Sequence, residues 1–200
     1  MRGLATLVGR VPRFALFTLA GLIQVALIAL MVIDRVGILR AGAEVTLQTR
    51  AVDPRDFLRG DYVTLAYDIS TVAAGELEDV KRGVPVFVKL APQPDGLYHA
   101  VSMHLEPVAV TAPEILIRGR VSGGPACTAM RPGEGRPVCD RFTVSYGIES
   151  YFVPQGEGHE IEKARNQGKV TVVAAVTPAG RAAIKRLLID GTPVYDEPLF

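Results

Sequence analysis

The sequence predicts a mainly β domain, either a barrel or a sandwich with one or two short helices, behind one N-terminal transmembrane helix. An uncharged apolar stretch near the N-terminus is long enough to cross a membrane. The rest of the chain consists of short runs of alternating apolar and polar residues, separated by turns rich in Gly and Pro. Several of these runs recur in the same order in two parts of the chain.

The apolar stretch is FALFTLAGLIQVALIALMVI, Phe14 to Ile33, and it contains no charged residue. As a helix it would be about 30 Å long, which is the thickness of the hydrocarbon core of a bilayer. We therefore predict an anchor helix over residues 14–36. A cleaved signal peptide is the alternative, because Ala41-Gly42-Ala43 has the form of a cleavage site. However, the apolar run is longer than a usual signal sequence, and charged residues separate it from that site.

Charges on either side of this helix give its expected orientation. Three arginines precede it with no acidic residue among them, whereas an aspartate accompanies the two arginines that follow it. Because cytoplasmic flanks carry the excess of Lys and Arg, we expect residues 1–13 in the cytoplasm and residues 43–200 outside it. In a bacterium this describes a single-pass protein of the inner membrane with a periplasmic domain.

Composition argues against several classes of partner and chemistry. The formal net charge of the 200-residue chain is +1, there is no Trp, and aromatic residues make up 6 %. No basic aromatic stripe is present, so we expect no nucleic-acid partner. The sequence also has no phosphate-binding glycine loop and no Ser-His-Asp or Cys-His constellation, so we expect no cofactor and no catalytic residues.

Four pairs of similar stretches suggest that the exported part consists of two related halves, residues ~43–107 and ~113–198. The pairs are EVTLQTRA and EILIRGRV, DYVTLAYDI and DRFTVSYGI, VPVFVKLAP and VTVVAAVTP, and LEP and DEP. Their common order favours two copies of one unit, which would pack together because three or four strands alone are marginally stable. Chance similarity is the alternative, since alternating strands resemble one another by default.

Two short helices are predicted in the second half. Residues 160–166 begin with an acid and carry basic residues late, as the helix dipole favours. In TPAGRAAIKRLL, Thr177 can cap a helix whose first position is Pro178, and the apolar residues that follow form one helical face.

The two cysteines, Cys127 and Cys139, bracket a loop rich in Gly and Pro. In an oxidising compartment we expect them to form a disulfide, which would stabilise the fold by about 3 kcal/mol. Free thiols or a half-built metal site are the alternatives, although no His or second cysteine pair lies near in the sequence.

The stretch RGDYVTLAYDIS, residues 59–70, reads as the start of a core strand. Alternation places its apolar residues on one face, including Leu65 and Tyr67, whose buried hydroxyl would need a partner. Gly60 permits a sharp turn, and Asp61 can accept hydrogen bonds from the amides of that turn. We therefore predict structural roles for Gly60, Asp61, Tyr62, Leu65 and Tyr67.

GDYVTLAY, residues 60–67, matches every fixed position of the pattern that names the GDYXXLXY family, and the chain resembles that family. The stretch YGIESYFVPQGEGHEIE at 146–162 is also similar to it, as is the layout of one membrane helix followed by an exported domain. The resemblance implies a membrane-anchored bacterial protein of uncharacterised function. Family members often sit beside, or are fused to, multi-spanning membrane proteins, and the family brings no catalytic residues to carry over.

An apolar loop in the second half is the candidate interaction site. ESYFVPQGEG places an apolar tip beside two glycines, and if exposed it would be a docking point; its residues are Tyr151, Phe152, Val153 and Pro154. If buried, it would fill the barrel. We expect a non-catalytic accessory module whose partner is an integral membrane or envelope protein, held in the lipid of the inner membrane by residues 14–36.

The alternative is a metal-binding or hydrolytic domain. Glu157, His159 and Glu162 are weak candidate ligands for a divalent ion if their loop folds back, although acids also suit the start of the helix that follows. VDPRDFLRGDYV resembles a stretch of signal peptidases, but residues 51–53 are Ala, Val and Asp where the nucleophilic Ser would be required.

Overall fold

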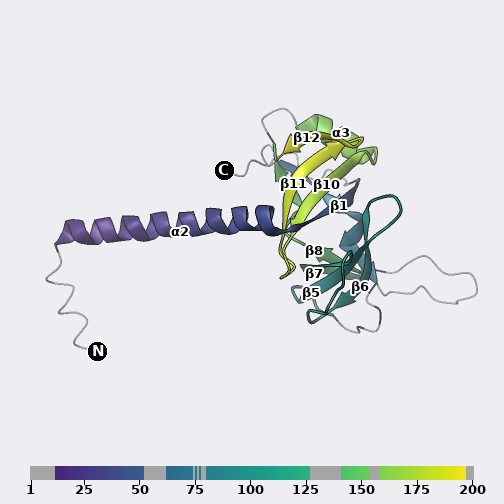
Figure 1. Ribbon diagram of the computed structural model, residues 1–200, viewed down its shortest axis with the longest axis horizontal. Coiled ribbons are helices and arrows are strands. Elements are labelled where there is room, and N and C mark those ends of the chain that lie inside the picture. Colours follow the sequence, from purple (N-terminus) through teal and green to yellow (C-terminus); the bar gives the residue numbers. More distant parts are fainter. Residues whose placement is uncertain are drawn as a thin grey trace, which may run out of the picture. The chain divides into compact units, whose positions relative to one another are not determined.

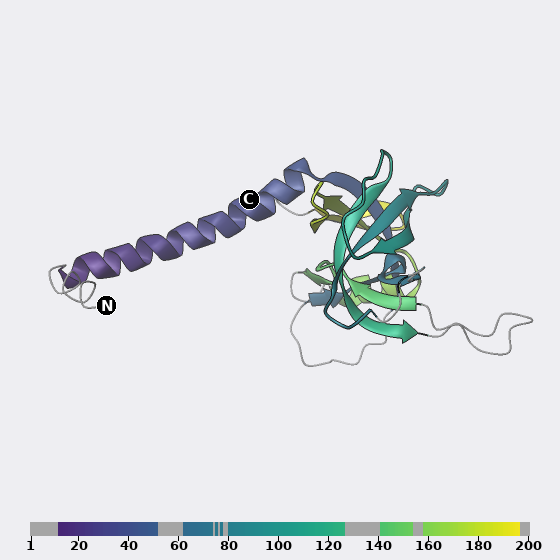
Figure 2. The ribbon, with the colours of Figure 1, turned by 90° about the horizontal axis from the view of Figure 1, so that it is seen from below.

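The structure is a computed structural model that describes residues 12–51, 62–73, 75, 77, 80–126, 141–153 and 158–196. Strands account for 46 % of it, and they curve into a nearly closed, barrel-like sheet (Figure 1). A second view shows these strands curving around a common interior (Figure 2). The predicted mainly β class is therefore confirmed. The chain divides into two compact units, which meet between Gly37 and Ile38.

Helix α2, Arg13–Ala41, carries the N-terminal apolar segment. Its span Phe14–Arg40 reaches a mean hydropathy of 2.6, and that window is not buried at all, so it is not a core helix of the β domain. A helix of this length and composition suits a membrane anchor or a signal sequence. The last turn of α2 belongs to the β domain, where Ile38 and Leu39 are buried against Ala183.

Within the described residues, the β domain contains two five-stranded antiparallel sheets and one two-stranded sheet. The first sheet has the order β12-β11-β10-β1-β3, with β1 (Ala43–Arg50), β3 (Ala66–Tyr67), β10 (Val170–Val176), β11 (Ala182–Ile189) and β12 (Thr192–Asp196). The second has the order β4-β8-β7-β5-β6, with β4 (Thr71–Ala73), β5 (Pro85–Pro92), β6 (Tyr98–His104), β7 (Ile115–Ala126) and β8 (Arg141–Ser145). Strand β2 (Tyr62–Thr64) pairs with β9 (Ser150–Phe152), and the 3₁₀ turn η1 (Asp68–Ser70) and helix α3 (Gly158–Asn166) complete the domain.

Both five-stranded sheets join strands that lie far apart in the sequence. Strand β1 pairs with β10 and β3, while β7 pairs with β5 and β8. Likewise β10 pairs with the strand that follows it, β11, as β5 pairs with β6. Each sheet therefore has a strand of residues 43–107 hydrogen-bonded to a strand of residues 113–198, so neither part can complete a sheet alone.

One hydrophobic core collects apolar side chains from both parts. In β5 the inward residues Val86, Val88 and Leu90 are fully buried, and their neighbours along the strand are not, as alternation in a strand requires. Strand β10, which lies in the middle of its sheet, is buried along nearly its whole length. The core thus joins the two parts of the chain. It contains strands that are buried on one face, such as β5, and strands that are buried on both faces, such as β10.

The helix predicted from TPAGRAAIKRLL is wrong. Residues 177–180 form a turn instead, in which the Gly180 N–H donates to the Thr177 carbonyl at 2.8 Å and Gly180 has a φ of +80°. The chain then continues as β11, paired along its length with β10. Pairing with a buried strand outweighed a local pattern that suits a helix. The other predicted helix, residues 160–166, is confirmed as part of α3.

Candidate functional site

The described part of residues 59–70, which carry the GDY stretch, has a mainly structural environment. Gly60 and Asp61 lie outside the described residues, and Tyr62 pairs through its backbone with Phe152 in β9. Leu65 and Tyr67 are almost completely buried in the core, as predicted. The Leu65 N–H donates to the carbonyl of Glu149 at 2.7 Å, which continues the contact with the second half.

Residues 62–73 and 141–152, here called the first and second tyrosine segments, pair with each other in an equivalent way. Val63 lies opposite Tyr151 where β2 meets β9, and Phe142 lies opposite Val72 where β8 meets β4. Exchanging the two segments leaves this register unchanged. In the same equivalence Tyr67 corresponds to Tyr146.

Two buried tyrosines link the segments by reciprocal hydrogen bonds. The Tyr67 hydroxyl donates to the carbonyl of Ile148 at 2.6 Å, and the Tyr146 hydroxyl donates to the carbonyl of Ile69 at 2.6 Å. Burial, and then the nearby carboxylate of Glu149, raise the pKa of both phenols well above their ordinary value. Both side chains therefore remain neutral hydrogen-bond donors at physiological pH. Their role is structural, because each one joins its segment to the other.

The turn after Tyr146 is organised by the carboxylate of Glu149. It accepts hydrogen bonds from the backbone N–H groups of Tyr146 and, at 2.9 Å, of Gly147. In the first tyrosine segment the equivalent residue is Ser70, whose hydroxyl accepts a longer bond of 3.4 Å from the Tyr67 N–H. The second turn is thus held by a charged group and the first by a weak neutral contact.

Arg165 of α3 is the buried charged residue that the sequence did not reveal. Only 1 % of it is exposed, and its guanidinium donates to the carbonyl of Thr64 and to the side chain of Asn166. Burial lowers the pKa of Arg165, and the carboxylate of Glu162 opposes that shift. Arg165 follows Ile161 by four residues, so helical spacing on the buried face was the one available signal. Its role is to hold α3 on strand β2.

Comparison with protein-family models shows a match to the GDYXXLXY protein model over residues 24–187. The chain belongs to the GDYXXLXY family. No curated protein and no solved structure matches it. The Leu and the final Tyr of the motif that names the family are the buried residues Leu65 and Tyr67, so this part of the GDYXXLXY motif specifies the core.

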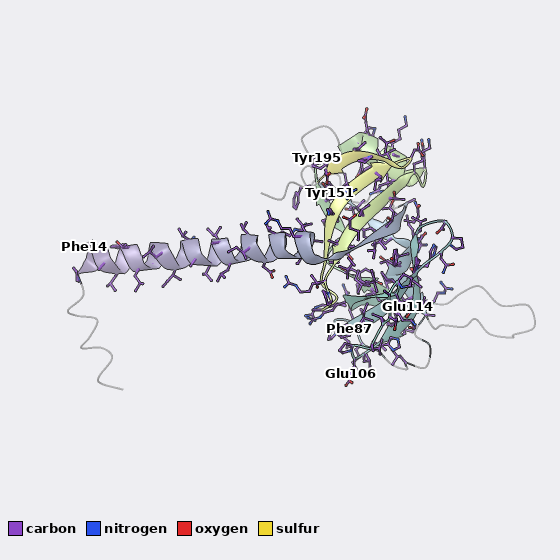
Figure 3. All side chains as sticks on the ribbon, viewed as in Figure 1. Phe14, Phe87, Glu106, Glu114, Tyr151 and Tyr195 are labelled. Atoms are coloured by element: carbon purple, nitrogen blue, oxygen red, sulfur yellow. The ribbon has the colours of Figure 1, made fainter. Side chains whose placement is uncertain are left out.

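The predicted interaction loop of this GDYXXLXY chain is divided between core and surface. Tyr151 and Val153 are buried, and the Tyr151 ring contacts Tyr195 of β12 edge to face, with centroids 5.5 Å apart and planes at 84° (Figure 3). Phe152 points outward and is 77 % exposed. Pro154 lies outside the described residues. Of the candidate side chains that the structure describes, Phe152 therefore lies on the surface, while Tyr151 and Val153 on either side of it lie in the core.

The weak metal candidates are not gathered into a site by the described part of the chain. His159 is exposed and Glu162 is half-buried on α3, while Glu157 lies outside the described residues. Among the residues that the structure describes, no group of three His, Cys, Asp or Glu side chains is placed to hold a metal ion. Cys127 and Cys139 also lie outside the described residues, so their disulfide stays a prediction.

Proposed function

We propose that this member of the GDYXXLXY family is a single-pass protein of the bacterial inner membrane whose periplasmic β domain binds an integral membrane or envelope protein. In this proposal α2 is the anchor, the N-terminus is cytoplasmic, and the domain acts by binding rather than by catalysis. The observation that carries it is the exposure of Phe152. This large apolar side chain is 77 % exposed, although the residues before and after it, Tyr151 and Val153, are buried.

The fold does not require an aromatic residue at this position. The equivalent residue of the first tyrosine segment is Ala73, which is also exposed, and strands β4 and β9 pair in the same register with their partners. A phenylalanine side chain has only two rotatable bonds, so it loses little conformational freedom when it enters a pocket of another protein. Phe152 therefore has the properties of an anchor residue at an interface.

The equivalence of the tyrosine segments also supports an origin by duplication. Reciprocal tyrosine bonds and an unchanged register under exchange are what two copies of one unit would produce around a twofold axis. In this proposal the shared residues maintain the scaffold. The exposed residues that differ between the copies, Phe152 among them, then carry the function.

Crosslinking in native membranes tests the binding role. A photoreactive amino acid would replace Phe152 in the full-length chain, and Ala73 in a matched control that is exposed at the equivalent position. We expect protein adducts from position 152 and few or none from position 73. Absence of adducts at 152, or equal yields at both positions, would refute Phe152 as an anchor residue.

The membrane topology is tested separately by a reporter fused to the C-terminus. A reporter that is active only after export should be active, and a reporter that is active only in the cytoplasm should be silent. The reverse result would place the domain in the cytoplasm and overturn the proposed location.

A further inference from the structure

A hollow of about 210 Å³ lies in the β domain beside Ala43, the first residue of β1. Its lining is mostly apolar and includes Ala43, Val110, Ile115, Leu116, Val176 and Pro178. The one acidic side chain in the lining, Glu114, is paired with Lys89 at 2.9 Å. The hollow therefore offers an apolar surface without an unpaired negative charge.

The covalent chain keeps this hollow near the end of the apolar span. Ala43 follows Arg40, the last residue of that span, by three positions, which is at most about 11 Å of extended chain. Gly42 packs closely within the β domain, because a Cβ there would lie 2.8 Å from both the Ile38 carbonyl oxygen and the Val176 nitrogen. If α2 spans a membrane, the short connection keeps the hollow within reach of the membrane surface.

The segment beside the hollow, residues 107–113, has the composition of a membrane-contacting surface. Its sequence PVAVTAP carries no charge, and Leu105, which the exposed Glu106 separates from it, is 46 % exposed. The backbone N–H groups of Val108, Ala109 and Val110 form no hydrogen bond with any described residue. Such groups need water or polar headgroup atoms, which the interfacial region of a bilayer supplies and its hydrocarbon core does not.

Two exposed arginines flank this apolar surface. Arg40 ends the apolar span, and Arg118 lies on the same face of β7 as Leu116, next to the turn whose Gly180 carbonyl accepts its N–H at 2.7 Å. Neither arginine takes part in an ion pair with a described residue. Phosphate groups of anionic lipids are natural partners for guanidinium groups in this position.

We propose that the edge of the β domain around the hollow rests on the surface of an anionic bilayer, with the hollow and residues 107–113 against the apolar part of the interface and Arg40 and Arg118 on lipid phosphates. The proposal depends on α2 being a membrane anchor, as proposed above. In this proposal the β domain has two binding surfaces. The hollow and its surroundings contact lipid, and Phe152, which precedes α3, contacts a protein partner.

Because the chain has no Trp, one introduced Trp can report its own contact with lipid. The full-length chain would be reconstituted in vesicles that contain brominated lipids, which quench Trp fluorescence. The reporters are Val110→Trp at the hollow and Ala109→Trp, which replaces an exposed side chain. Phe17→Trp in α2 reports insertion of the anchor.

The matched surface control is Gln167→Trp. Gln167 is exposed and adjoins Gly168, whose carbonyl accepts from Gln48 near the far end of β1. Along β1, the ends of the strand are separated by about 23 Å. We expect strong quenching of the reporter at position 17, clear quenching at positions 109 and 110, and little at position 167.

The outcomes separate the two proposals. An unquenched reporter at position 17 would refute the anchor itself, whereas quenching at 17 without quenching at 109 and 110 would refute only the lipid-facing edge.

Arg118→Gln should reduce quenching at 110 in vesicles with anionic lipid, and this effect should fade at high salt. Equal quenching at position 110 with neutral and anionic lipid, unaffected by Arg118→Gln, would overturn the role of the arginine. Quenching that is equal at positions 110 and 167 would overturn the assignment of this edge.

Discussion

The first and second tyrosine segments have the same strand pairing and reciprocal tyrosine hydrogen bonds. They differ in the residue that holds the turn after the tyrosine and in an exposed residue at the end of the segment. Ser70 in the first corresponds to Glu149 in the second, and the exposed Ala73 corresponds to the exposed Phe152. Buried positions are apolar in both segments, but only the tyrosines and the isoleucines two residues after them are identical, since Val63, Leu65 and Val72 correspond to Phe142, Val144 and Tyr151. Among the positions that differ, those that organise a turn or face outward are where a function can be added without loss of the fold.

The largest expected effect concerns the shared core. Leu65→Ala should destabilise the domain by about 2–5 kcal/mol, because it leaves a cavity at a fully buried position. The equivalent change, Val144→Ala, should cost about 1 kcal/mol less, since it removes one methylene group fewer. Denaturant unfolding of the full-length chain in detergent measures both. A larger loss for Val144→Ala would show that the two positions are not equivalent.

The two turns should differ clearly in sensitivity. Glu149→Ala removes a charged acceptor from two backbone N–H groups and should cost about 1.5–3 kcal/mol. Ser70→Ala removes a bond of 3.4 Å and should cost less than about 0.5 kcal/mol. Glu149→Gln should recover part of the loss, because its amide oxygen can still accept. Similar unfolding midpoints for the two alanine variants would contradict this asymmetry.

The reciprocal tyrosines should be equally sensitive. Tyr67→Phe leaves the Ile148 carbonyl without its donor, and Tyr146→Phe does the same to the Ile69 carbonyl. Each should cost about 1–3 kcal/mol, with the two values within about 0.5 kcal/mol of each other. Unequal costs in the same unfolding measurement would break the proposed equivalence of the segments.

These tyrosines also predict a loss of stability at high pH. Their pKa is raised in the folded state, so above about pH 10 the unfolded chain releases protons that the folded chain retains. Stability is then fully present below that pH and falls by about 1.4 kcal/mol per pH unit for each tyrosine as the pH rises further. The double variant Tyr67→Phe, Tyr146→Phe should lose this part of the dependence, and an unchanged slope would refute it.

The smallest effect on stability is expected at the position that differs most on the surface. Phe152→Ala should change the free energy of unfolding by less than about 0.5 kcal/mol, because the side chain is 77 % exposed. It should nevertheless reduce recovery of the partner in a pull-down from solubilised membranes. A large loss of stability would assign Phe152 to the scaffold instead.

Periodicity and local chemistry predicted part of this molecule and could not predict the rest. Alternation located Leu65 and Tyr67 in the core, and the acidic start located α3. Residues 177–188 have a local pattern that suits a helix, but residues 177–180 form a turn and β11 is a strand because it pairs with β10 and β12. The carbonyl that accepts from Tyr67 is 81 residues away, and the one that accepts from Arg165 is 101 residues away, so no local pattern could identify either.

The pairing of β1 with β10 determines when the domain can fold during synthesis. Strand β1 is the first to follow the apolar helix, but its partner runs from Val170 to Val176. Until the ribosome has made that strand, one edge of β1 stays open and its inward residues Val45 and Leu47 lack much of their cover. A chain that stops before residue 170 therefore leaves this apolar strand edge unpaired, close in the sequence to the apolar helix.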